Sequence, residues 1–151
     1  MKKRLISFLL ALCMVLSLVP VGAVADGTST FASGKTITAS DLGLGSDNKP
    51  TNVGGEDYGW TYTGSSYNKT LTIKECYILD LGDATLDCTY VSVVNDGEIK
   101  SGTFILPVFN TSDSAVSFTN NGTISGGKFF KNSNGKGLLY NTASSTITGG
   151  F

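Results

Sequence analysis

An internal repeat of 25 residues constrains the fold more than any other feature of the sequence. Residues 91–105 (VSVVNDGEIKSGTFI) reappear as residues 116–130 (VSFTNNGTISGGKFF), with seven of the fifteen aligned positions identical. A third, looser copy (LLYNTASSTITGGF) covers residues 138–151. Apolar and polar residues alternate within the copies, which is the period of a β-strand and not of a helix. A repeat of about 20 to 50 residues made of short strands predicts a solenoid.

Stacked coils would place equivalent residues above one another, about 4.8 Å apart. Three apolar columns are therefore predicted to fill one core: Val93 over Phe118 over Leu139, Ile99 over Ile124 over Ile147, and Phe104 over Phe129 over Phe151. Asn95, Asn120 and Asn141 would form a ladder of side-chain amides along one edge of that core. Gly97 and Gly122 would turn the corners with positive φ, which glycine adopts without steric cost.

The N-terminal residues 1–25 have the pattern of a secretory signal peptide. Lys2, Lys3 and Arg4 precede an apolar run, and the small-residue triplet Ala23-Val24-Ala25 ends the segment. The apolar run is shorter than the ~20 residues that a membrane helix needs. We therefore expect an extracellular, secreted chain, associated with the cell surface and without a membrane span after cleavage.

The charge of the chain after cleavage argues against a nucleic-acid partner. Eight basic and twelve acidic residues remain, a net charge of −4, and neither Arg nor His is among them. Basic side chains that neutralise phosphates supply most of the affinity for nucleic acids. Histidine, the commonest general base and transition-metal ligand, is also missing. No cofactor is expected.

We expect three regions in the chain. After the leader, residues 26–55 are rich in small and polar residues and predict a flexible lead-in with one short strand and a helical turn near Ser40. Residues 56–151 predict an all-β domain, a short right-handed parallel β-helix of about three to four coils. Its N-terminal part, residues 58–62 and 70–73, reads as two strands joined by a turn. The third copy stops at Phe151 without a capping segment, so we expect either a fragment of a longer protein or an open edge that self-associates.

Several side chains are candidates for binding. The aromatic residues Tyr58, Trp60, Tyr62 and Tyr67 could stack on sugar rings, or they could cap the end of the core instead. Asp80, Asp83 and Asp87 could begin a Ca²⁺ site, although six to eight oxygens are normally needed and turn or solvent positions would explain them equally.

Two cysteines remain after leader cleavage, and their pairing depends on the path of the chain between them. Cys76 and Cys88 would face each other if the chain reversed at Gly82-Asp83, and a disulfide would then form. In a regular solenoid they would lie too far apart.

The segments GWTYTGSSYNKTLTI and ILDLGDATLDC, followed by the repeated pattern N-G-x-I-x-x-G-x-F, resemble secreted surface proteins of Gram-positive bacteria. Those proteins carry right-handed parallel β-helix repeats of the pectate-lyase-like class and are adhesin-like or carbohydrate-binding. The resemblance implies a non-catalytic, structural or adhesin-like surface module with glycans as partners. The alternative is a carbohydrate-binding or polysaccharide-degrading β-helix, a lyase or a hydrolase, of which only the N-terminal part is present.

Overall fold

The structure is a computed structural model that describes residues 35–65, 68–108, 116–132 and 137–150. All described residues belong to one compact unit. The leader, Tyr67 and Phe151 lie outside the described residues. Among the described residues, no helix has the length and apolar character that a membrane crossing requires.

The described part of the lead-in contributes to the core. Strand β1 (Thr36–Ile37) is followed by the short helix α2 (Ala39–Leu42). Thr38 begins the helix with a capping box, in which its hydroxyl accepts from the backbone of Asp41 while the Asp41 carboxylate accepts from the backbone of Thr38. Ile37 and Leu42 are buried in the hydrophobic core. The edge of the core therefore does not coincide with the expected domain boundary at residue 56.

An antiparallel hairpin forms the next part of the fold, as the sequence predicts. Strand β3 (Trp60–Ser65) pairs with β4 (Asn68–Ile73), with Trp60 opposite Ile73 and Tyr62 opposite Leu71. The short strand β2 (Gly54–Gly55) pairs with the other side of β3, and the 3-10 helix η1 (Glu56–Tyr58) connects the two. Trp60 and Tyr62 both point into the core, as alternation along a strand requires.

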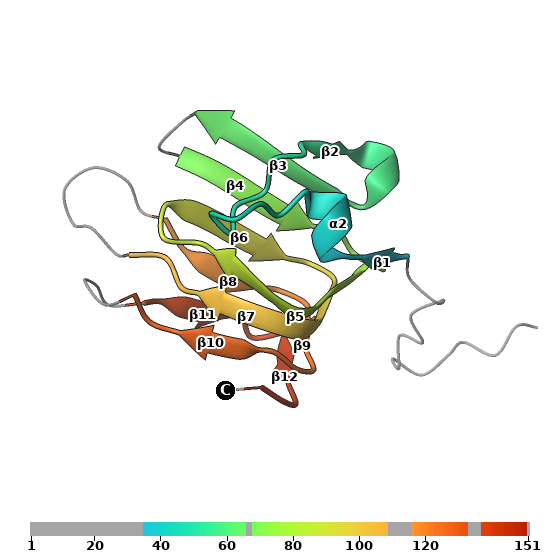
Figure 1. Cartoon of the computed structure of the whole chain (residues 1–151). Helices are drawn as coiled ribbons and strands as arrows, with labels where there is room; N and C mark the ends of the chain where they lie inside the picture. Colours follow the sequence, from blue (N-terminus) through green and yellow to red (C-terminus); the bar gives the residue numbers. More distant parts are fainter. Residues whose placement is uncertain (1–34, 66–67, 109–115, 133–136, 151) are drawn as a thin grey trace, which may run out of the picture. The chain divides into compact units, whose positions relative to one another are not determined.

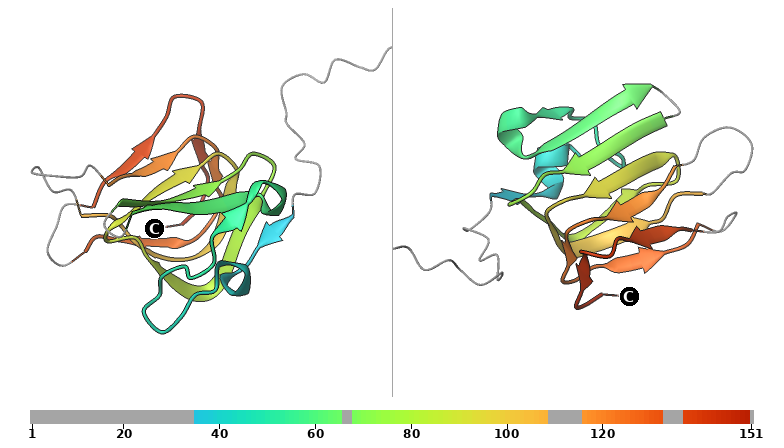
Figure 2. Two further views of the ribbon diagram at one scale, coloured as in Figure 1. Left: turned by 90° about the horizontal axis from the view of Figure 1, so that it is seen from above. Right: turned by 180° about the vertical axis from the view of Figure 1, so that it is seen from behind.

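The remaining strands wind into a β-solenoid of about three turns (Figures 1 and 2). They are β5 (Ile78–Asp87), β6 (Val91–Asn95), β7 (Glu98–Ile105), β8 (Phe118–Asn120), β9 (Thr123–Ile124), β10 (Lys128–Phe130), β11 (Leu139–Asn141) and β12 (Thr146–Ile147). One sheet, sheet A, has the order β1-β5-β7-β9-β12, with β10 also pairing β7. The other, sheet B, has the order β11-β8-β6-β4-β3-β2. All pairs between successive coils are parallel, so each coil takes its register from the preceding one.

The predicted columns are confirmed wherever the structure describes them. Val93 pairs with Phe118 and Phe118 with Leu139, while Ile99 pairs with Ile124 and Ile124 with Ile147. Phe104 pairs with Phe129, and their rings stack with centroids 5.0 Å apart. The Phe118 ring meets Phe104 edge-on at 5.8 Å. The core is thus one continuous stack between the two sheets.

The predicted ladder of asparagines is also confirmed. Asn95 Nδ2 donates to Asn120 Oδ1 at 2.7 Å, and Asn120 Nδ2 donates to Asn141 Oδ1 at 2.7 Å. Asn95 and Asn120 are completely buried, and their amides are satisfied by this ladder together with the backbone oxygens of Thr123 and Gly122, to which Asn95 Nδ2 and Asn120 Nδ2 also donate. In the preceding coil the equivalent position is Ile73, which cannot donate. Asn95 Oδ1 is accordingly buried without a hydrogen-bond partner.

At the corners of Gly97 and Gly122 glycine is required because there is no room for a side chain, and not because the backbone has a positive φ. The expected positive φ at Gly97 and Gly122 is wrong, because neither belongs to the left-handed glycines of the described chain. A Cβ atom on Gly122 would instead lie 2.1 Å from the carbonyl oxygen of Gly97, and one on Gly97 would lie 2.3 Å from that of Tyr77. The coils approach each other too closely at this corner for any side chain.

Gly82-Asp83 is not a chain reversal. Strand β5 continues through this dipeptide from Ile78 to Asp87, with an irregular register against β7. Gly82 has φ +59, and its backbone N–H donates to the Ser101 hydroxyl at 2.7 Å. The left-handed conformation of Gly82 therefore produces an irregularity within strand β5 and not a turn.

Candidate functional site

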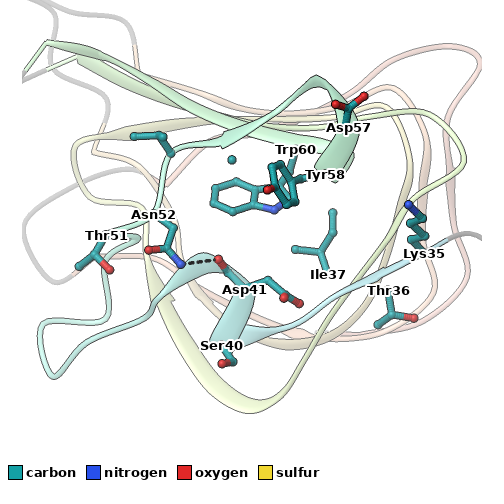
Figure 3. A pocket seen from close by; sticks show the side chains of 12 residues that line it. Lys35, Thr36, Ile37, Ser40, Asp41, Thr51, Asn52, Asp57, Tyr58 and Trp60 are labelled. Carbon is teal, nitrogen blue, oxygen red and sulfur yellow. Dashed lines mark hydrogen bonds between the residues drawn. The ribbon is translucent and has the colours of Figure 1, made fainter.

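A cavity of about 920 Å³ lies at the N-terminal end of the solenoid (Figure 3). Its walls come from β1, α2, the segment before β2, η1 and the first residue of β3. This volume is within the range of about 300–1,000 Å³ that is typical of ligand-binding pockets. Because β1 and α2 belong to the segment expected to be flexible, the sequence did not indicate this cavity.

Two glycine turns shape the aromatic wall of the cavity. Gly54 has φ +67, and a Cβ atom there would overlap both the carbonyl oxygen and the indole ring of Trp60. Gly59 has φ +78, and a Cβ atom there would lie 2.0 Å from the ring of Tyr77. Both positions combine a left-handed backbone with close packing, so only glycine fits them. The wall is therefore fixed by the local backbone.

The four aromatic candidates do not act as one cluster. Trp60 and Tyr62 are only 3% and 6% exposed and belong to the core, which agrees with a capping role. Tyr58 lies in η1, before the strand, and is 68% exposed at the cavity. Tyr58 therefore does not share the buried face of Trp60 and Tyr62, because Gly59 turns the chain between η1 and β3. Tyr67 lies outside the described residues.

Polar residues also line the cavity. Thr36, Ser40 and Thr51 are among the lining residues, and the Thr51 hydroxyl donates to the Gly43 backbone oxygen at 2.7 Å. Asn52 is held in place by a 2.8 Å hydrogen bond from its amide to the backbone oxygen of Asp41. Exposed Val53 adds an apolar patch. Figure 3 shows Asn52 and Asp41 on the side of the cavity opposite Tyr58, and the side chains of Ser40 and Thr51 directed away from the rings.

The charged groups at the cavity are Lys35, Asp41 and Asp57. Hydrogen bonds from the Thr38 hydroxyl and backbone lower the pKa of the Asp41 carboxyl, which is therefore anionic at neutral pH. Both bonds go to Oδ2, at 2.6 and 2.8 Å, so the cap does not use Oδ1. Two carboxylates and one ammonium thus give the cavity an excess of negative charge.

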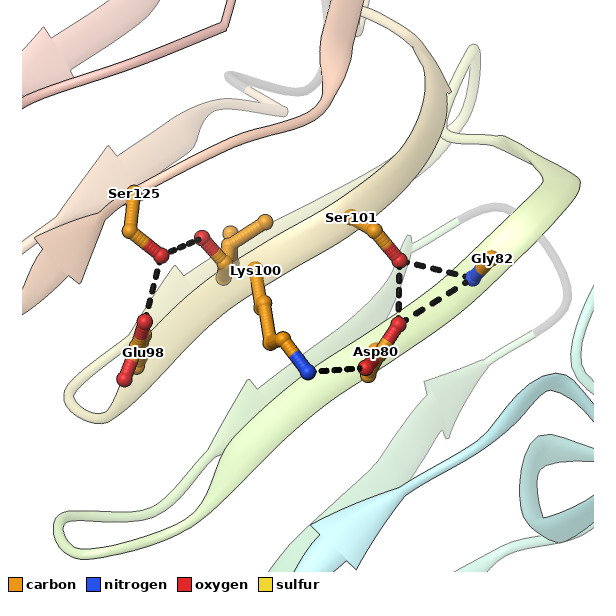
Figure 4. A network of polar contacts seen from close by, with 7 residues as sticks. Asp80, Gly82, Glu98, Lys100, Ser101 and Ser125 are labelled. Carbon is orange, nitrogen blue, oxygen red and sulfur yellow. Dashed lines mark hydrogen bonds and ion pairs between the residues drawn. The ribbon is translucent and has the colours of Figure 1, made fainter.

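The carboxylates proposed for Ca²⁺ are not brought together. Asp80 forms an ion pair with Lys100 at 2.8 Å and also accepts from the Ser101 hydroxyl, as Figure 4 shows. Asp87 accepts from the backbone and hydroxyl of Thr89, while Asp83 is exposed. No group of three or more metal-ligating side chains occurs within the described ranges. Asp80 and Asp87 therefore serve local contacts, and Asp83 faces solvent.

Polar contacts between coils continue along the outside of sheet A. The Lys100 ammonium, followed by the Ser101 hydroxyl, holds the pKa of Asp80 below its ordinary value. In the next coil Ser125 bonds the Glu98 carboxylate and donates to the Ile99 backbone oxygen (Figure 4). At the corner, Asn121 donates to Asp96 at 2.8 Å. Side chains of neighbouring coils thus pair with each other across the stack.

The two cysteines are free thiols, so the disulfide that we considered does not form. Cys76 is exposed in the turn before β5, and Cys88 is completely buried directly after it. Ten strand residues rising about 3.3 Å each separate the thiols by far more than the ~7 Å between Cα atoms that a disulfide tolerates. Burial raises the pKa of the Cys88 thiol strongly, which leaves it protonated and unreactive.

Comparisons of the chain with family models, with curated proteins and with solved structures find no match. The geometry of the solenoid and of its cavity is therefore the basis for any functional conclusion.

Proposed function

We propose that the chain is an exported, non-catalytic β-solenoid module with a structural or adhesin-like role at the cell surface. The observation that carries this proposal is that polar side chains on the outside of the coils form contacts with the neighbouring coil. Asp80 with Lys100, Glu98 with Ser125, and Asp96 with Asn121 each join one coil to the next. Such contacts support a rigid stack that presents a surface, which is the use that solenoids commonly serve.

Export is supported by the order of charged, apolar and small residues in residues 1–25. The experiment is to express the full chain in a Gram-positive host and to follow it in cytosol, cell wall and medium. Adhesion is then measured by coating beads with the released chain and counting the beads bound to host cells or to mucin. Retention in the cytosol, or binding no greater than that of uncoated beads, would contradict the proposal.

The second candidate is a carbohydrate-binding or polysaccharide-degrading β-helix, and the cavity with exposed Tyr58 favours its binding form. A glycan array compares the original chain with Tyr58→Ala, because Trp60→Ala would also remove a core side chain. Incubation with polygalacturonate, with and without Ca²⁺, tests for the unsaturated product of a lyase. Release of that product would replace the non-catalytic proposal.

A further inference from the structure

We infer that the N-terminal cavity binds a glycan of neutral or amine-bearing sugars and discriminates against acidic ones. This inference rests on the adhesin-like function proposed above and names the ligand through which that function would work. It depends on three features of the cavity: an exposed aromatic ring on a fixed support, an excess of carboxylates, and polar groups on the side opposite the ring.

The ring of Tyr58 is the platform. It is 68% exposed, although it lies only two residues before the buried Trp60 and lines the same cavity. The packing of Gly59 against Tyr77 fixes the turn that carries it. A pyranose ring presents C–H groups on one face, and these pack favourably on the face of an aromatic ring. A ring that is exposed before binding and held by its backbone loses little conformational entropy when the sugar stacks on it.

Polar partners for sugar hydroxyls lie across the cavity from this platform. The Asn52 amide is already oriented by its bond to the Asp41 backbone, and Asp41 Oδ1 is not used by the helix cap. The Thr51 hydroxyl is not counted among these partners, because it donates to the Gly43 backbone oxygen at 2.7 Å. A site with an aromatic face and a few oriented donors and acceptors suits a ligand that has hydroxyls around its rim.

Charge determines which sugars fit. Asp41 and Asp57 bring two carboxylates to the cavity against the single ammonium of Lys35. A uronate or sulfated sugar would be repelled by this excess, since like charges brought together in an interface disfavour binding. A protonated amino sugar would be attracted by the carboxylates and by the face of the Tyr58 ring. This preference is opposite to that of a site for acidic polysaccharides.

The experiment is isothermal titration calorimetry of the released chain with three tetrasaccharides of equal length. These are glucosamine tetramer, N-acetylglucosamine tetramer and galacturonic acid tetramer, each measured at low and high salt. We expect the amine-bearing ligand to bind most tightly, the neutral one next, and the acidic one at least about tenfold more weakly than the neutral one. Salt should weaken binding of the amine-bearing ligand selectively.

Four variants test the assignment to this cavity. Tyr58→Ala should weaken binding about tenfold, whereas Tyr58→Phe keeps the platform and should bind like the original chain. Asp57→Asn should reduce the preference for the amine-bearing over the neutral ligand. Tyr90→Ala removes an aromatic ring of similar exposure, 60%, that does not line the cavity, and it should change nothing.

Equal or tighter binding of the acidic tetramer would overturn the inference, as would an unchanged affinity in Tyr58→Ala. Failure of all three ligands to bind would also overturn it. In that case adhesion of coated beads by Tyr58→Ala at the original level would leave the adhesin-like function standing, with another surface responsible. Loss of adhesion by every variant, Tyr90→Ala included, would instead point to a damaged fold.

Discussion

Inside the core, Asn95 Nδ2 donates a hydrogen bond of 2.7 Å to Oδ1 of Asn120, which lies 25 residues further along the chain. The repeat period of the sequence is thus visible as a hydrogen bond between two equivalent side chains. Because Asn120 donates in turn to Asn141, the middle residue of the ladder satisfies two neighbours, while Asn95 has a neighbour on one side only.

This asymmetry predicts unequal costs of substitution. Asn120→Leu takes away one of the two acceptors of buried Asn95 Nδ2, the other being the Thr123 backbone oxygen, and it leaves Asn95 Oδ1 unsatisfied as before. Asn95→Leu removes that unsatisfied oxygen and leaves Asn120 Oδ1 without its donor instead, so the number of unsatisfied buried groups does not rise. Because Asn120→Leu breaks both hydrogen bonds of the ladder and Asn95→Leu only one, Asn120→Leu should lower the free energy of unfolding by about 1 kcal/mol more. Urea denaturation of both variants measures the difference. An equal or larger loss for Asn95→Leu would contradict the ladder.

Glycine at the close corner should tolerate no side chain. Gly122→Ala places a methyl group 2.1 Å from the Gly97 carbonyl oxygen, and we expect a loss of about 3 kcal/mol or more. Gly82→Ala is the matched control, because nothing lies within 4 Å of a Cβ atom there and only the left-handed backbone is penalised, by about 1–2 kcal/mol. Thermal unfolding of the two variants should rank them in this order. The reverse ranking would mean that the coils do not approach each other as described.

The thiols should differ sharply in reactivity. Exposed Cys76 should react with a thiol reagent in the native state, whereas buried Cys88, with its raised pKa, should react only after unfolding. Counting modified thiols by mass spectrometry in buffer and in denaturant tests this, and Cys76→Ser should leave no thiol that reacts rapidly. Two unreactive cysteines in the native, non-reduced chain would instead indicate a disulfide.

The ion pair on sheet A predicts a pH dependence. Lys100 and Ser101 lower the pKa of Asp80 in the folded chain, so Asp80 stabilises the fold above its unfolded pKa. That contribution should be lost as the pH falls through the lower, folded value. The Asp80 carboxylate raises the pKa of Lys100, whose contribution is present below its unfolded pKa and is lost as the pH rises through the folded one.

Asp80→Asn should therefore flatten the acidic limb of a stability profile measured by thermal unfolding between about pH 2 and 6, the range in which carboxyl groups titrate. The effect will be small, because both partners are accessible to solvent and such pairs are screened. An acidic limb of unchanged slope in Asp80→Asn would show that this pair does not contribute. Asp83→Asn, at an exposed residue of the same strand, is the control.

The sequence was sufficient to predict the architecture, because the repeat indicates which residues of successive coils pair with each other. Once residues 25 apart are stacked, Ile99 must meet Ile124 and Asn95 must meet Asn120, and both contacts are observed. The hairpin could be predicted as well, since its strands alternate around a polar turn. These features depend on periodicity, which a single sequence contains.

Other features depend on distances between segments, which periodicity does not contain. Gly82-Asp83 resembles a turn locally, but the pairing of β5 with β7 holds the strand extended on both sides of it. Ile37 and Leu42 looked isolated in a polar segment, yet they cover the open end of the core. The cavity exists only because that segment folds back beside Tyr58. The residues that line it were therefore only partly recognisable from the sequence, through the aromatic residues Tyr58 and Trp60.

The glycine corner, where one coil rests on the backbone of the next, has a consequence for how such a protein can change in length. A single residue inserted within a strand such as β6 would shift the later side chains of that strand to the opposite face. Asn95 and Asn120 stack across 25 residues and Asn120 and Asn141 across 21, so coils of unequal length keep the same stack. Extra residues can therefore be accommodated between the strands, whereas the stack itself grows only by one further coil of about 4.8 Å.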